Sequence, residues 1–116
     1  MTVRTAEADA REAARRLFAR DIDDYIAHLE GVRRLSPNSV RAYREDLVAF
    51  LEWSRREAVV PSRLTHRDLR SYLLELTRAG YSTRTISRHL SSLRGMFRWM
   101  YREGRCASAA VAAVAS

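Results

Sequence analysis

The sequence predicts an all-α fold, a small bundle of four to five helices. Apolar residues recur every three or four positions in several successive segments, which is the spacing of helices packed on a core. Alternation with a period of two is scarce, and the Asn-Gly and Asp-Gly pairs typical of hairpins do not occur. With 116 residues, the chain fits one domain that can fold without disulfides or a structural metal.

The first helix is expected from Ala6 onward, after a disordered stretch from Met1 to Thr5. Apolar side chains then keep one helical phase from about residue 12 to residue 33. Two alternatives stay open here. One helix runs straight through Asp21, or Asp21 caps a second helix.

The second and third helices have clear start signals. Ser36 can cap free amides and Pro37 suits the first helical position, so a helix is expected from there to about Glu57. A short link containing a proline follows, and the third helix is expected to begin at Thr65. Gly80 ends it, because glycine readily adopts the left-handed conformation of a helix cap.

Residues 82–103 have the clearest amphipathic pattern. The apolar stripe consists of Ile86, Leu90, Leu93, Phe97 and Met100. The opposite face carries Arg84, Arg88, Arg98 and Arg102, with Arg94 on its flank and Ser87, Ser91 and Gly95 as small residues between them. Tyr101 is expected on the core side and Trp99 nearer the polar side. A helix with such a face can approach a phosphate backbone closely, so this segment is predicted to bind DNA.

The formal net charge of +7 is unevenly placed along the chain. Residues 1–62 hold 11 arginines and 11 acidic residues, whereas residues 63–116 hold 10 arginines and three acidic residues. The whole excess therefore lies in the half that contains residues 82–103. All 21 basic residues are arginine, which pairs well with phosphate and with guanine edges, although a lack of lysine is also typical of a GC-rich genome.

No set of residues indicates catalysis, a cofactor or a metal site. His28, His66 and His89 fall on three different helices without a metal-binding partner nearby, and are interpreted as surface or core-edge residues. The pairs Asp23-Asp24 and Glu45-Asp46 are interpreted as solvated, because adjacent residues point about 100° apart on a helix.

The remaining composition indicates a soluble, cytoplasmic protein that does not contact a membrane. There is one cysteine, Cys106, so neither a disulfide framework nor a zinc finger is expected. No run of about 18 apolar residues could span a bilayer. The Ala-rich end of the chain, residues 106–116, is either a linker or a short docked helix.

Three blocks of the sequence resemble the core-binding domain of tyrosine recombinases, of the Xer-type and phage-integrase-like group. Residues 35–53, LSPNSVRAYREDLVAFLEW, resemble its second helix at Ser36, Pro37, Val40, Tyr43, Asp46, Leu47 and Phe50. Residues 82–104, STRTISRHLSSLRGMFRWMYREG, resemble its fourth helix at Thr85, Ile86, Arg88, Leu90, Ser91, Leu93, Arg94, Phe97 and Met100. Residues 64–76, LTHRDLRSYLLEL, look like its third helix.

This resemblance implies a SAM-like bundle that clamps double-stranded DNA opposite the catalytic domain of the same recombinase. It also implies that the first helices help neighbouring protomers pack in a DNA-bound tetramer. The second and fourth helices would cross in or over the major groove. The implied DNA contacts are Asn38, Ser39, Arg41, Arg44, Arg84, Ser87, Arg88, Ser91, Arg94 and Arg98. Arg94 has an alternative, an ion pair with Asp46 or Glu75.

On this interpretation residues 1–20 form a partly helical extension, residues 21–105 the DNA-binding domain, and residues 106–116 an Ala-rich linker or tail. The family's catalytic residues belong to a later domain, so none is assigned. The chain is expected to be either an excised part of a bacterial recombinase, nucleoid-associated when bound, or a short protein that binds DNA without cutting it. The alternatives are a helical interaction or dimerisation module, with arginines that are only solvated, and a helix-turn-helix regulator with its turn at residues 79–82.

Overall fold

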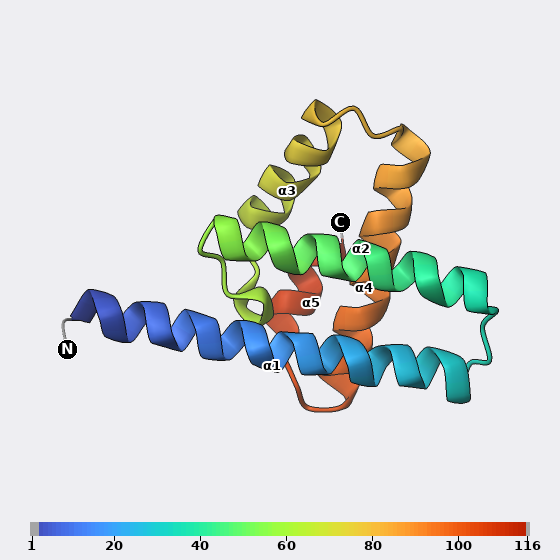
Figure 1. Cartoon of the computed structure of the whole chain (residues 1–116), viewed down its shortest axis with the longest axis horizontal. Coiled ribbons are helices and arrows are strands. Elements are labelled where there is room, and N and C mark those ends of the chain that lie inside the picture. The colour runs from blue at the N-terminus through green and yellow to red at the C-terminus, as the bar shows by residue number, and fades with distance from the viewer. Residues whose placement is uncertain (1–2, 116) are drawn as a thin grey trace.

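The computed structural model describes residues 3–115, and they form a helical bundle without strands, as the sequence predicts. Its elements are α1 (Val3–Gly31), α2 (Pro37–Arg56), the 3-10 turn η1 (Pro61–Arg63), α3 (His66–Arg78), α4 (Thr83–Arg102) and α5 (Ser108–Ala115). α1 and α2 run side by side in opposite directions, and α4 crosses both steeply (Figure 1). α5 packs against α3, α4 and η1.

The sequence signals for the starts of α2 and α3 predicted both positions correctly. The Ser36 hydroxyl accepts a hydrogen bond from the Ser39 amide at 3.3 Å, with Pro37 at the first helical position. Thr65 forms the predicted start of α3, and Gly80 ends that helix with a φ of +89°. These caps are set by neighbouring residues alone, so sequence is enough to find them.

α1 runs through Asp21 without a break, which selects the first of the two alternatives. The expected disorder at the start of the chain was wrong for residues 3–5, since α1 begins at Val3. The Ala-rich composition of this segment favours a helix beyond the part that packs on the bundle. Met1 and Thr2 lie outside the described residues.

The core is centred on the ring of Phe50, which is fully buried. Its centroid lies 5.9 Å from that of Phe18 on α1, 5.3 Å from Tyr72 on α3 and 6.4 Å from Phe97 on α4. All three are edge-on contacts, the arrangement that aromatic quadrupoles favour. One α2 side chain therefore joins three other helices.

Two aromatic residues at the end of α4 are placed opposite to the sequence-based expectation. Trp99 is buried at 5% exposure, whereas Tyr101 is 52% exposed. The reason is that this end of α4 packs on α1 as well as on the central core. The Trp99 ring lies 5.4 Å from that of Tyr25 on α1, and Arg105 covers its face at 4.5 Å.

Asp46 is buried at 2% exposure, so its interpretation as a solvated residue was wrong. Its Oδ2 accepts hydrogen bonds from Arg88 Nε and from Ser92 Oγ, both at 2.9 Å. Its Oδ1 accepts one from Arg88 Nη2 at 2.8 Å. Because Asp46 is on α2 and its partners are on α4, this carboxylate holds the crossing of the two helices.

His89 is also buried, at 5% exposure, and extends the Asp46 network to α3. Its Nε2 lies 3.2 Å from Asp46 Oδ1, and its Nδ1 lies 3.2 Å from the Tyr72 hydroxyl. Burial lowers the pKa of His89, while Asp46 acts in the opposite direction. A neutral imidazole that donates from Nε2 to Asp46 and accepts from Tyr72 at Nδ1 satisfies both contacts.

The Ala-rich end of the chain is a docked helix, the second of the two alternatives. Ala110, Ala113 and Val114 of α5 are buried. The turn before α5 is tied to α1, because Arg105 Nη1 lies 2.9 Å from Asp21 Oδ1 and 2.7 Å from an Asp24 oxygen.

Replacing Phe50 by alanine should lower the free energy of unfolding by about 3–5 kcal/mol, because it empties the point where four helices meet. Val48→Ala is the matched control on the same helix, since Val48 is 42% exposed; its change should stay within about 0.5 kcal/mol. Urea unfolding followed by circular dichroism gives both values. Equal losses for the two variants would contradict this core.

His89 should make stability depend on pH. Burial lowers its pKa below the ordinary 6.5, so its contribution is complete above that pH and is lost as pH falls through the lower folded-state value. His89→Gln keeps a donor for Asp46 and an acceptor for Tyr72 but does not titrate. The free energy of unfolding from urea titrations at about pH 7.5 and about pH 5 should fall more for the wild type. Parallel pH dependences would refute this role.

Candidate nucleic-acid interface

The outer face of α4 carries most of the residues predicted to contact DNA. Arg84, Ser87, Arg88, Ser91 and Arg98 are exposed, and Arg94 is half-buried. They repeat every three or four residues, so they follow one side of the helix. This side lies opposite Leu93, Met96 and Phe97, which are buried in the core.

The arginines on this face differ in how they are held. Arg84, Arg98 and Arg102 form no ion pair or hydrogen bond with the residues that the structure describes, so their charges face solvent. Arg88 is paired with Asp46. The α4 face therefore combines arginines that face solvent with arginines held by a partner, among them Arg88.

Arg94 does not form the ion pair that the sequence offered as an alternative to DNA contact. Asp46 is paired with Arg88 instead, and Glu75 with Arg56 at 2.8 Å. Arg94 Nε donates to the carbonyl of Val114 on α5 at 2.7 Å. Sequence reasoning missed this partner because the docking of α5 is a tertiary contact.

The predicted contacts on α2 lie in its first two turns and are all exposed. Arg41 Nη1 lies 3.5 Å from Asn38 Oδ1, at the limit of a hydrogen bond. Arg44 Nη1 lies 2.8 Å from Asp23 Oδ1 on α1, in an exposed ion pair. Exposed pairs of this kind contribute little and exchange readily, so Arg44 remains available to another anion. Ser39 shares a hydrogen bond of 3.1 Å with the Ser36 hydroxyl.

A second group of arginines gathers where α1, α2 and α4 meet. Burial raises the pKa of the Tyr25 hydroxyl, and the nearby positive charges of Arg33, Arg98 and Arg102 act in the opposite direction. A Cβ at Gly95 would lie only 2.6 Å from that hydroxyl oxygen, so Tyr25 rests directly on the α4 backbone. Arg33, which follows the end of α1, is therefore close enough to this hydroxyl to act on it together with two arginines of α4. The sequence offered no signal for this, because Arg33 follows the end of another helix.

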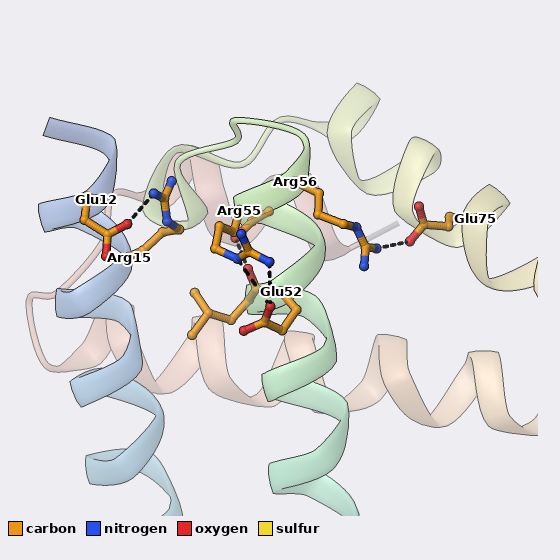
Figure 2. Close-up of polar contacts among 8 residues, drawn as sticks. Glu12, Arg15, Glu52, Arg55, Arg56 and Glu75 are labelled. Atoms are coloured by element: carbon orange, nitrogen blue, oxygen red, sulfur yellow. Dashed lines mark hydrogen bonds and ion pairs between the residues drawn. The ribbon is translucent and has the colours of Figure 1, made fainter. Parts of the chain in front are cut away.

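At the other end of the bundle, three arginines are compensated by nearby glutamates (Figure 2). Arg15 on α1 pairs with Glu12, and on α2 Arg55 pairs with Glu52 at 3.3 Å. Arg56 reaches across to Glu75 on α3. Arg84, Arg98 and Arg102 of α4 have no such acidic partner among the residues that the structure describes.

Two properties of residues 3–115 bear on the type of site. They contain no group of three or more His, Cys, Asp or Glu side chains placed to hold a metal ion. None of their helices is both long enough and apolar enough to cross a membrane.

Comparison with known proteins places the chain in a family. Residues 22–104 match the family described as phage integrase, N-terminal SAM-like domain. The chain is similar to a protein named Tyrosine recombinase XerC from Stutzerimonas stutzeri, with 40% identity over 87 residues that cover 74% of this chain and 29% of that protein. It is 31% identical over 122 residues to a protein of the same name from Chlorobaculum parvum, which covers 98% of this chain and 35% of that protein.

The chain thus spans between 29% and 35% of the length of these relatives. No solved structure matches it significantly. The family match covers α2, α3 and α4 completely, together with the last ten residues of α1, 22–31. The chain belongs to the family of N-terminal SAM-like domains of phage integrases.

Proposed function

We propose that this chain binds double-stranded DNA as the core-binding part of a site-specific tyrosine recombinase or integrase. The observation that carries the proposal is the exposed arginine face of α4, held by Asp46 against α2, whose first turns carry a second exposed polar set. The similarity to proteins named tyrosine recombinase supports the same assignment.

The dimensions of α4 suit a DNA groove. Arg84 and Arg98 lie 14 residues apart on one side of the helix, and a helix rises about 1.5 Å per residue. The basic stretch is therefore about 21 Å long, and about 27 Å when Arg102 is included. One turn of DNA is about 34 Å, so these side chains follow most of one turn.

The chain's part in the reaction is binding rather than bond cleavage. Three buried titratable groups, Asp21, Asp46 and His89, contact residues of other elements: Asp46 and His89 join each other and Tyr72, and Asp21 pairs with Arg105, as expected of structural residues. Strand cleavage would fall to a catalytic domain of the same recombinase, which would clamp the DNA from the opposite side. Neighbouring protomers in a DNA-bound tetramer are the further proposed partners, and the cytoplasm, at the nucleoid, is the proposed location.

The DNA-binding unit proposed here is residues 21–105. It contains the second part of α1, from Asp21 onward, and all of α2, α3 and α4, and it ends at the Arg105 contact with Asp21. A helical dimerisation module is the competing function. That module would need the α4 arginines only for solubility, so the two functions differ in whether these arginines set the salt dependence of DNA binding.

The 116-residue chain should bind a 20-base-pair duplex in the micromolar range, with log affinity against log salt falling at a slope of about −4. Arg84→Ala combined with Arg98→Ala should reduce that slope by about 2, because each removes one phosphate contact. Fluorescence anisotropy at several salt concentrations measures this.

Arg67→Ala combined with Arg70→Ala is the matched control. It removes two exposed arginines from α3, away from the proposed face, and changes the net charge by the same amount. Its slope should match that of the wild type. DNA affinity that does not depend on salt, or an equal change in both double variants, would refute the proposed interface.

A further inference from the structure

The Arg88–Asp46 pair is anchored on the most deeply buried carboxylate among the ion pairs of the described residues; Arg105–Asp21 is the nearest to it, with Asp21 at 8% exposure. The Asp46 side chain is 1% exposed and that of Arg88 is 43% exposed, whereas both partners of Arg44–Asp23, Arg55–Glu52 and Arg56–Glu75 are at least 41% exposed. The carboxylate thus fixes the guanidinium from inside the protein. A guanidinium that donates two hydrogen bonds to a buried carboxylate has little rotational freedom left.

The atoms used by Asp46 leave one edge of Arg88 available. Nε and Nη2 donate to the two Asp46 oxygens at 2.9 Å and 2.8 Å. Nη1 has no partner among the described residues, and Nη2 keeps its second hydrogen. These donors form the outer end of the guanidinium, on the exposed side of α4. Two hydrogen-bond acceptors spaced about as far apart as Nη1 and Nη2 could therefore accept from both nitrogens.

Charge decides which acceptor pair fits. Arg88 and Asp46 together are formally neutral, so the pair attracts phosphate less than a free arginine does. A phosphate at the outer edge would also feel repulsion from the Asp46 carboxylate behind it. Guanine offers two acceptors, O6 and N7, in the major groove and carries no net charge. A positioned but neutralised arginine therefore favours a base edge over the backbone.

We propose that Arg88 reads a guanine edge in the major groove, and that Asp46 is the positioning residue that aims it. This inference rests on the proposed DNA binding of the α4 face. The unpaired arginines Arg84 and Arg98 supply affinity without sequence preference, and Arg88 supplies the preference.

Selection of a random duplex library with the 116-residue chain, followed by affinity measurements, tests the proposal. The selected sequences should share at least one fixed guanine. Replacing it by 7-deazaguanine, which lacks the N7 acceptor, should weaken wild-type binding about fivefold or more. Arg88→Lys should bind both duplexes equally, because its single nitrogen pairs with Asp46 and keeps that buried charge compensated.

Arg84→Lys is the matched control, one turn earlier on the same helix and without a carboxylate partner. It should retain the guanine preference. Asp46→Asn is the second variant, with its folding checked by thermal melting. Because it frees the charge of Arg88, it should lose the guanine preference and bind with a salt slope steeper by about 0.9.

The outcomes separate the two levels of the proposal. Binding without a guanine preference, or a preference that survives in Arg88→Lys, overturns the role of Arg88 and leaves DNA binding intact. A loss of affinity in Arg88→Lys that is equal for every duplex assigns the residue to phosphate, and also overturns it. No DNA binding by the wild type refutes the proposed function itself.

Discussion

The buried carboxylate of Asp46 is the constraint on which the rest of the arrangement depends. Burying a charge is unfavourable unless hydrogen bonds replace its water, and Asp46 receives them from Arg88, Ser92 and His89 on α4. Removing one partner of such a pair typically lowers the free energy of unfolding by about 3–5 kcal/mol. Hydrophobic contacts between two helices, in contrast, can repack after a small shift of one helix along the other. The network therefore specifies one crossing of α2 and α4, and with it the relative position of the two polar faces that are proposed to meet DNA. The contact between the Tyr72 hydroxyl and His89 connects α3 to the same network.

Features set by neighbours in the sequence could be predicted, and features set by packing could not. The starts of α2 at Ser36 and of α3 at Thr65 depend on residues within one turn, so their prediction was confirmed. The exposure of Trp99 and Tyr101 depends on how α4 meets α1, and there the sequence prediction was wrong. Asp46 did carry a usable signal. It lies three residues after Tyr43 and four before Phe50, in phase with the apolar stripe, and its adjacent acid Glu45 is indeed exposed. The sequence carried no usable signal for the partner of Arg94 or for the position of Arg33, because both depend on contacts between segments distant in sequence.

The placement of charge connects this packing to function. Arg15, Arg55 and Arg56 at one end of the bundle pair with Glu12, Glu52 and Glu75. On α4, Arg88 pairs with Asp46, whereas Arg84, Arg98 and Arg102 pair with no acidic residue in the part of the chain that the structure describes. Asp46 holds Arg88 in place and does more than reduce the basic charge of this face. A surface of this kind can separate two tasks, attraction by mobile charges and selection by a fixed donor. The same helix can then serve both, because its inner face is fixed to the core.

The most direct test of this account is to map the DNA contact on the folded chain. A two-dimensional NMR titration of the ¹⁵N-labelled protein with a short duplex reports the chemical-shift change of each backbone amide. The account predicts that the largest changes fall in the first two turns of α2, at residues 38–44, and along α4 at residues 84–98, while residues 66–78 of α3 change little. Changes concentrated on α3, or spread evenly over all helices, would contradict it.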